Sequence, residues 1–253
     1  MPRYLSWLCA FLVVTLAVPA LAGEIAANQA RISFLTGNAV LERPSEPTSR
    51  ALKTGDTLLA GDMVTTGRKS RLEISLPDGS IARFDENATF TLNALQYEPK
   101  VKRSIKIRVT LGKMWAKVAK LTGISGGFDV SARTMTAGVR GTVYRLNVNK
   151  DDSVLVKVYW GEVLVKSKPA GQETAPAAAK PATPAVGPPT AVSGPEPVAG
   201  PAKVTMTEWT AILKGMQQLS VHPDGTLGSP YTFDPIQDRD VWVRWNQERD
   251  KGP

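Results

Sequence analysis

The chain has 253 residues, a formal net charge of +8 and a single cysteine, Cys9. This length allows one domain with additional segments. Cys9 lies in a segment that we expect to be removed, so the mature protein can form no disulfide, thiolate nucleophile or cysteine metal site. The positive charge favours anionic partners, and it bears on encounter and solubility rather than on fold.

Residues 1–22 have the pattern of a secretory signal peptide. Arg3 supplies a positive charge, an apolar run follows from Leu5 to Val18, and Ala20-Leu21-Ala22 is a small-residue cleavage site. We predict cleavage after Ala22, which removes Arg3 and lowers the net charge to +7, and a periplasmic or secreted protein. The apolar run is short for a membrane-spanning helix, and no later stretch is apolar enough to span a membrane.

Residues 23–49 are predicted to hold a hairpin, at 30–43, that precedes the main domain. Its strands are indicated by two short apolar runs separated by Thr36-Gly37-Asn38. Three glycines then recur at an interval of six residues, Gly55, Gly61 and Gly67. This spacing predicts turns between short strands, in either a compact barrel or a small solenoid.

Several acidic residues could suggest catalysis or metal binding. Asp78 lies in Pro77-Asp78-Gly79-Ser80, a typical turn sequence, and Asp85 and Glu86 precede an asparagine. Acidic residues beside Gly and Asn are common in turns, so we favour a structural role for all three. Asp151-Asp152 is assigned to a polar hairpin loop, because a hard cation needs several converging oxygens.

Residues 100–120 hold eight Lys or Arg and no Asp or Glu. Strict alternation predicts a strand with Ile105 and Ile107 on one face and basic residues on the other. The candidate binding residues are Lys102, Lys106 and Arg108, with Lys113 and Lys117 expected to extend the positive area past Gly112. Two interpretations remain open: a solvated face that protects an edge strand from aggregation, or a docking surface for an anionic envelope partner. Nucleic acid is disfavoured because no aromatic residues are interleaved for base stacking.

The stretch 136–148 is central to the predicted β unit. We expect Gly138 and Gly141 to bracket a short bend, followed by a half-buried strand with Tyr144 inward and Arg145 outward. Arg140 lies between the two glycines. We favour a structural role, in which its guanidinium binds carbonyls or a carboxylate inside the fold, over a role in ligand binding.

Six motifs in order resemble the FecR family, a bacterial periplasmic domain named after the ferric-citrate signal transducer. The resemblance covers residues 50–166 and implies a compact, mainly β domain with solenoid-like character. The family signature corresponds to Gly138, Val139, Arg140, Gly141 and Thr142. The motifs are Leu52-x-x-Gly55-Asp56-x-Leu58 with Gly61-Asp62-x-Val64-x-Thr66-Gly67, Leu76-Pro77-Asp78-Gly79-Ser80, Gly112-Lys113-x-Trp115-x-x-Val118, Phe128-Asp129-Val130, Ala137-Gly138-Val139-Arg140-Gly141-Thr142 and Val158-x-x-Gly161-x-Val163-x-Val165.

Residues 167–202 contain nine prolines and ten alanines, which predicts an extended linker without a core. Residues 203–253 are then expected to be helical. One helix would begin at the capping box Thr205-x-x-Glu208, and a second would follow Asp238-Arg239-Asp240. We expect Trp209, Trp242 and Trp245 to cover an open side of the β domain, and the alternative is a platform for a partner or glycan.

The sequence contains no recognisable catalytic motif, and His222, the only histidine, lies in a predicted turn. We therefore predict a protein that is not an enzyme and has no cofactor or metal. The preferred function is binding or scaffolding of a cell-envelope partner, either a protein or an anionic glycan or lipopolysaccharide. The alternative, implied by the family resemblance, is a component of a FecR-type transmembrane signalling pathway that regulates iron uptake through an anti-sigma factor.

Overall fold

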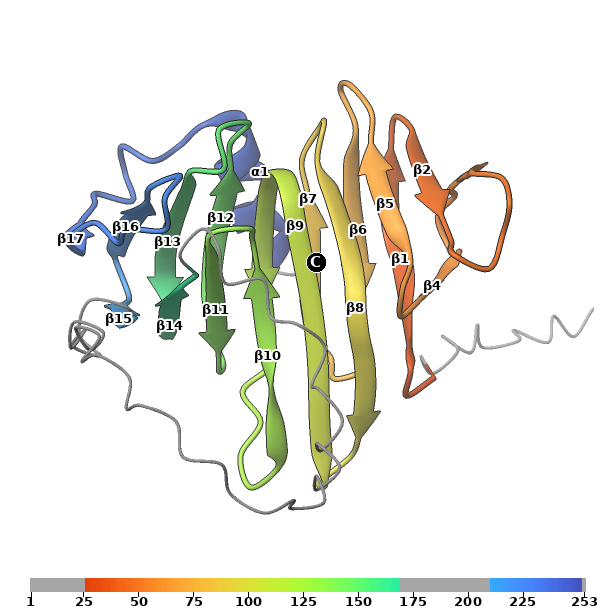
Figure 1. Ribbon diagram of the computed structural model, residues 1–253, viewed down its shortest axis with the longest axis horizontal. Helices are drawn as coiled ribbons and strands as arrows, with labels where there is room; N and C mark the ends of the chain where they lie inside the picture. Colours follow the sequence, from red (N-terminus) through yellow and green to blue (C-terminus); the bar gives the residue numbers. More distant parts are fainter. Residues whose placement is uncertain (1–25, 169–209, 252–253) are drawn as a thin grey trace, which may run out of the picture.

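The structure is a computed structural model, and it describes residues 26–168 and 210–251. The predicted signal peptide, most of the Pro/Ala-rich linker and the capping box at Thr205–Glu208 lie outside these residues. Strands dominate, and one short helix is present near the C-terminus of the described chain (Figure 1). The mainly β prediction is confirmed. None of the helical structure in the described ranges is long and apolar enough to cross a membrane.

The strands form two layers, which we call sheet A and sheet B. Every neighbouring pair in sheet A is antiparallel. Its spatial order is β4 (Thr57–Leu59), β1 (Gln29–Thr36), β6 (Arg71–Ser75), β7 (Ile81–Phe84), the second half of β9 (Lys102–Lys117), β12 (Val143–Val148), β13 (Val154–Trp160), β16 (Gln217–Val221) and β17 (Tyr231–Thr232).

Sheet B is antiparallel except where β9 and β10 run parallel. Its spatial order is β3 (Arg50–Ala51), β2 (Ala39–Glu42), β5 (Met63–Thr66), β8 (Thr89–Glu98), the first half of β9, β10 (Ser125–Ser131), β11 (Met135–Val139), β14 (Glu162–Ser167) and β15 (Thr210–Lys214). The fold is therefore an open two-layer sandwich joined through β9.

Strand β9 is the longest strand and passes from one sheet to the other (Figure 1). Its first half pairs with β8 and β10, and its second half pairs with β7 and β12. The change occurs at Gly112, which has a φ of 96° and lies so close to Ala88 that a Cβ would be 2.6 Å from the Ala88 Cα. Glycine is needed at this bend for both reasons.

One hydrophobic core fills the space between the sheets. The predicted inward residues Ile105 and Ile107 of β9 are fully buried in it. Phe84 of sheet A stacks on Phe90 of sheet B with ring centroids 3.6 Å apart. Side chains from both inner faces thus meet in one layer, as expected for a sandwich of two half-apolar sheets.

The hairpin predicted at 30–43 is wrong, although strands form at both of its apolar runs. Strand β1 pairs with β4 and β6 in sheet A, whereas β2 pairs with β3 and β5 in sheet B. The turns predicted at Gly55, Gly61 and Gly67 connect strands of opposite sheets in the same way. From β1 to β6 the chain therefore passes back and forth between the two sheets, and each strand pairs antiparallel with its neighbours in its own sheet.

The C-terminal segment is only partly helical, which corrects the two-helix prediction. Where the first helix was predicted, Ile212 and Leu213 lie in β15 and Leu219 lies in β16, and these strands extend sheet B and sheet A respectively. Pairing with the free edges of β14 and β13 outweighs the local helical spacing. The second predicted helix is confirmed as α1 (Val241–Asp250), where the Asp240 side chain caps the backbone N–H of Val243. Helix α1 lies behind the sandwich in Figure 1.

Candidate binding surface

The outer face of sheet B is not covered by any described part of the chain, and it carries the first half of the predicted basic surface. Lys102, Lys106 and Arg108 are exposed there, as the alternation predicted. Among the described residues none of the three makes an ion pair within 4.0 Å. Strand β9 lies between β8 and β10, so it is not an edge strand. The interpretation that its basic residues protect an edge from aggregation is therefore wrong.

The register shows which neighbours each of these residues has. Opposite Lys102 stands Glu98 of β8, and beside Lys106 stands Asp129 of β10. Arg108 instead has only hydroxyl-bearing cross-strand neighbours, Thr91 and Ser131. We call the row Thr91, Arg108, Ser131, Thr136 and Lys166, which crosses β8, β9, β10, β11 and β14, the open row.

Lys113 and Lys117 do not extend this surface, contrary to the prediction. They follow the bend at Gly112 and belong to sheet A. The Lys113 Nζ lies 3.6 Å from Asp85 and 3.8 Å from Asp240, and the Lys117 Nζ donates a hydrogen bond of 3.0 Å to the Asp250 carbonyl. Lys113 thus contacts Asp240, the N-cap residue of α1, and Lys117 contacts Asp250 at the end of the same helix. Both contacts arise because β9 belongs to sheet A after the bend.

Arg140 is exposed in the connection between β11 and β12, which contradicts the favoured structural role. Its side chain makes no hydrogen bond or ion pair with the described residues, although its backbone carbonyl accepts from the Thr142 hydroxyl. The binding interpretation of Arg140 stays a prediction.

The remaining signature residues build the turn. Gly138 lies within β11, so the bend is formed by Gly141 alone, which has a φ of 60°. Its Cα faces Lys120 so closely that a Cβ would be 2.6 Å from the Lys120 Cβ. Thr142 is buried and donates a hydrogen bond of 2.8 Å to the Glu162 carbonyl, while Val139 is buried in the core. The hydrogen bond from Thr142 to Glu162 thus joins the connection before β12 to the first residue of β14.

The outer face of sheet A is covered by the C-terminal segment. A row of cross-strand neighbours runs across β6, β7, β9, β12 and β13. We call it the covered row, and its members are Glu73, Arg83, Trp115, Arg145 and Lys157. Four of these are buried and Lys157 is half-buried. Arg145 was predicted to point outward, and it is among the buried residues because the C-terminal segment covers this face.

Glu73 and Arg83 form the first buried charge cluster with α1. The Arg83 Nε donates to Glu73 at 2.6 Å, and its Nη1 donates to Asp250 at 2.7 Å. Arg249 also donates two hydrogen bonds to the Glu73 carboxylate, at 3.0 and 3.1 Å. Burial by itself would raise the pKa of Glu73, but hydrogen bonds from Arg249, Arg83 and Ser33 outweigh it and lower the pKa to about 2.

Asp238 is the centre of a second cluster, just before α1. Its carboxylate accepts hydrogen bonds from Arg145 at 3.0 Å, from Lys157 at 3.1 Å and from the Tyr159 hydroxyl at 2.6 Å. Burial opposes ionisation, yet these donors keep the pKa of Asp238 below its ordinary value. The same burial and the bond to Asp238 raise the pKa of Tyr159.

Aromatic packing completes this contact. Trp242 is 3% exposed, and it forms a separate cluster with Trp115, Tyr159 and Val243. The Trp242 and Trp245 rings stack with centroids 5.3 Å apart. The expectation that these two tryptophans cover the β domain is confirmed, and Trp209 lies outside the described residues.

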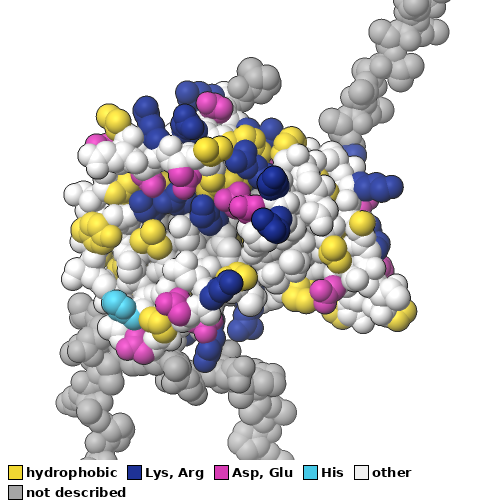
Figure 2. All heavy atoms as spheres, turned by 90° about the horizontal axis from the view of Figure 1, so that it is seen from above, with side chains coloured by type: hydrophobic (Ala, Val, Ile, Leu, Met, Phe, Trp, Pro, Cys, Tyr) yellow, Lys and Arg dark blue, Asp and Glu magenta, His cyan; other side chains and the backbone are white. Residues whose placement is uncertain are grey.

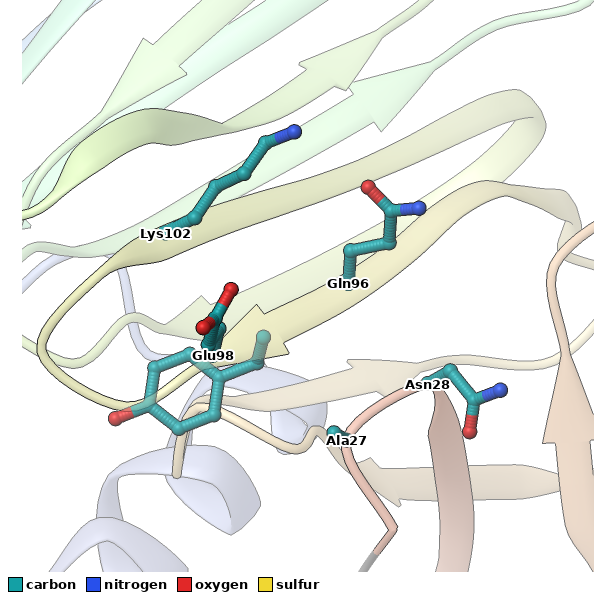
Figure 3. A pocket seen from close by; sticks show the side chains of 6 residues that line it. Ala27, Asn28, Gln96, Glu98 and Lys102 are labelled. Atoms are coloured by element: carbon teal, nitrogen blue, oxygen red, sulfur yellow. The ribbon is translucent and has the colours of Figure 1, made fainter.

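Other surfaces of the described chain are mixed in charge. Seen from above, basic side chains are interspersed with acidic ones (Figure 2). A shallow depression of about 370 Å³ lies at the end of β8 and β9, lined by Asn28, Gln96, Glu98 and Lys102 among others. Gln96, Glu98 and Lys102 project to the same side of the strands (Figure 3). This depression holds one acid and one base, so its charge favours neither a cation nor an anion.

The rejected catalytic and metal candidates have structural partners. Asp78 is buried and accepts hydrogen bonds from Ser80 and Arg103. Asp152 pairs with Arg133 at 2.6 Å, and Asp151 accepts from Ser153. Within residues 26–168 and 210–251, no group of three or more His, Cys, Asp or Glu residues is arranged to hold a metal ion.

The described chain is thus a strand-rich sandwich in which one outer face is open and the other is covered by the C-terminal segment. Residues 62–164 match the family model described as FecR protein, and this match lies within the predicted range 50–166. This part of the chain therefore matches the FecR family, and the match includes the signature at 138–142.

Two solved structures resemble the fold. They are crystal structures, at 1.65 and 2.50 Å resolution, of a "putative anti-sigma factor" from Parabacteroides distasonis ATCC 8503. Each is 14% identical to this chain with a TM-score of 0.44, and the similarity covers 68% of this chain. The chain spans 60% of the length of these structures. No curated protein sequence matches the chain.

Proposed function

We propose that this FecR-domain protein is a non-catalytic, extracytoplasmic protein that binds a cell-envelope partner through the outer face of sheet B. The observation that carries the proposal is the contrast between the two outer faces. The chain covers sheet A with its own C-terminal segment, whereas Lys106 and Arg108 stand exposed on sheet B without an ion-pair partner among the described residues.

The charge of this face favours an anionic partner, such as an acidic glycan, lipopolysaccharide or an acidic protein surface. Basic residues in the middle of a sheet are not needed to protect an edge, so their exposure supports a binding role. Attraction between exposed charges is screened by salt, so the association should weaken as ionic strength rises.

The test is crosslinking and pull-down of residues 23–253 with native envelope, at low and at moderate salt. Wild-type protein is expected to associate at low salt, and the double variant K106E/R108E is expected to lose that association. The matched control is K53E/R68E, which makes the same change in net charge at two exposed residues elsewhere. Unchanged association of K106E/R108E at low salt would contradict the proposal.

A second candidate function is participation in a FecR-type signalling pathway, which the FecR match favours. The same crosslinking experiment separates the two functions. Recovery of a membrane receptor or an anti-sigma partner supports signalling, whereas recovery of glycan or lipopolysaccharide that is released by salt supports envelope binding.

A further inference from the structure

The large hydrophobic side chains that remain exposed are concentrated at one end of the sandwich. Within residues 26–168 and 210–251 there are seven of them, and four belong to β13, β15, β17 or the turn between β15 and β16. These four are Trp160, Ile212, Met216 and Tyr231, with exposed fractions of 59%, 58%, 42% and 52%. Strands β15 and β17 end sheet B and sheet A, at the left of Figure 1. Single exposed apolar residues are common on protein surfaces, whereas a group of them marks an interaction site.

Three turns that connect the two sheets are stacked at this end. They are the turns at Gly141, Gly161 and Gly215, which join β11 to β12, β13 to β14 and β15 to β16. A Cβ on Gly161 would lie 2.6 Å from the Gly141 carbonyl oxygen, and a Cβ on Gly215 would lie 3.7 Å from the Trp160 Cα. The backbones of neighbouring turns are therefore in contact, and Trp160 and Met216 lie on adjacent turns.

The backbone conformation of Met216 is unusual for such a side chain. Its φ is 64°, in the left-handed region that favours glycine, asparagine and aspartate over bulky apolar residues. The other non-glycine residues with a positive φ in the described ranges are all polar. The Met216 N–H donates a hydrogen bond of 2.7 Å to the Val158 carbonyl, which holds the turn in place. An exposed methionine thus stands where a small polar residue would be less strained, and such strain is found at functional sites.

Basic residues surround these apolar side chains. Arg140 and Lys214 each directly precede the glycine of their turn, and Lys120 packs against the first of the three turns. All three are exposed, and none forms an ion pair within 4.0 Å with another described residue. The one acid in the three turns, Glu162, is exposed opposite Lys214. The charge of this end is therefore net positive.

We propose that these turns dock the protein on an anionic phospholipid surface. The docking residues are Lys120, Arg140, Trp160, Lys214 and Met216, which we call the corner surface. Trp160 and Met216 enter the boundary between the lipid headgroups and the acyl chains, and the three cations contact lipid phosphates. This contact uses a different part of the molecule from the outer face of sheet B, so it does not rest on the proposed function.

The composition of the corner surface favours a lipid surface over a small ligand or a glycan. Small ligands bind in concave sites, whereas this surface consists of turns at the ends of strands. An exposed tryptophan could stack on a sugar ring, but a methionine offers a hydroxylated ligand no comparable contact. Trp160 and Met216 both gain from transfer out of water into a lipid boundary, and tryptophan is favoured there. The unpaired cations select anionic over neutral lipids.

The test is sedimentation of residues 23–253 with vesicles made of equal parts of phosphatidylglycerol and phosphatidylcholine. Wild-type protein is expected to bind these vesicles, and to bind vesicles of phosphatidylcholine alone at least several-fold more weakly. Trp160→Ser should weaken binding by about tenfold or more, as loss of one large apolar side chain from the lipid boundary implies. R140Q/K214Q should also weaken binding by about tenfold or more, since each cation contributes about fivefold.

Met216→Asn separates membrane binding from folding. Asparagine tolerates the left-handed conformation better than methionine, so the variant should be at least as stable as wild type in thermal unfolding. It should nevertheless bind the anionic vesicles several-fold more weakly. Two controls should bind like wild type. One is Ile236→Ser, at an apolar residue that is 66% exposed between β17 and α1, and the other is K53Q/R68Q, at two exposed cations near the opposite end of both sheets.

Fluorescence quenching by lipids with brominated acyl chains tests insertion at the tryptophan itself. Wild-type protein should be quenched more strongly than Trp160→Phe, which keeps an apolar ring but removes the indole. Absence of vesicle binding by wild-type protein, or equal losses in W160S and I236S, would overturn the proposal. Loss of binding in R140Q/K214Q alone, with W160S and M216N binding like wild type, would show adhesion by charge without insertion and would also overturn it.

Failure of this inference is distinguishable from failure of the proposed function. Envelope association that is lost in K106E/R108E, together with no binding to vesicles, supports the outer face of sheet B and overturns this inference. Vesicle binding that is lost in W160S, together with envelope association that K106E/R108E leaves unchanged, supports this inference and contradicts the proposed function.

Discussion

The two outer faces of the sandwich carry similar sequence patterns and have opposite environments. The covered row and the open row each alternate with core residues, and each contains charged side chains. In the covered row the charges are buried against α1 and the residues before it. Glu73 and Arg83 pair with each other, and the other partners come from residues 238–250. In the open row no described segment lies over Arg108 and Lys166. A charged residue in an alternating strand thus indicates an outer face of a sheet, but not whether that face meets water, the chain itself or a partner.

The largest effect is expected from Arg83→Ala in the covered row. The substitution removes the partner of Glu73 and Asp250 inside a buried network, and breaking such a pair typically costs about 3–5 kcal/mol. The free energy of unfolding, measured by chemical denaturation, should fall by this amount. Arg108→Ala is the matched control in the open row and should change it by less than about 0.5 kcal/mol. Equal effects of the two substitutions would remove the distinction between the faces.

Acidification should lower the free energy of unfolding, because it neutralises carboxylates that are paired on the covered face of sheet A. The pKa of Glu73 is lowered from 4.5 to about 2 in the folded protein, so the unfolded chain binds more protons between these values. The contribution of Glu73 is thus fully present above about pH 4.5 and is lost as the pH falls toward 2, by an amount on the order of 3 kcal/mol. The lowered pKa of Asp238 acts in the same direction.

Glu73→Gln is the variant that isolates this contribution. It should be less stable than wild type near neutral pH, and the difference should shrink as the pH falls toward 2, because Glu73 then becomes protonated and loses the charge that Gln lacks. Denaturation curves at a series of pH values measure the difference. A difference that does not depend on pH would show that Glu73 acts by packing rather than by charge.

A smaller effect is expected from Asp238→Asn. The amide keeps the shape of the side chain but loses the charge that accepts from Arg145, Lys157 and Tyr159. Hydrogen bonds to a charged group contribute about 1.5–3 kcal/mol, and we expect a loss within this range. The loss of stability is measured by thermal unfolding, followed by the fluorescence of the buried tryptophans. Trp242 reports on it because α1 begins directly after Asp240, two residues beyond Asp238. Asp234→Asn, at an exposed turn residue that contacts only its own loop, is the control.

The smallest effects distinguish two residues of the family signature. Thr142→Val removes the buried hydrogen bond to the Glu162 carbonyl and should lower the free energy of unfolding by about 1 kcal/mol. Arg140→Ala should leave it unchanged, since the exposed side chain has no bond to the described residues. A marked fall in melting temperature for Arg140→Ala would restore the structural interpretation of this residue.

The strands and the helix with the strongest local signals were predictable from sequence. The alternation of Ile105 and Ile107 with Lys106 and Arg108 predicted both faces of the first half of β9, and Asp240 at the start of an apolar periodicity predicted α1. The FecR resemblance was equally accessible, because its motifs record short turns and close backbone approaches that few residue types allow.

The misassignments have one physical cause. Whether β1 and β2 pair with each other, whether residues 210–221 form strands or a helix, and whether Lys113 continues the surface of Arg108 all depend on long-range pairing. The sequence by itself determined a mainly β chain that matches the FecR family over residues 62–164, the inward and outward sides of most strands, and α1. Only the tertiary structure decided which outward side is buried and which basic residues meet, because strand pairing joins residues that are distant in the chain, whereas local patterns act over a few residues.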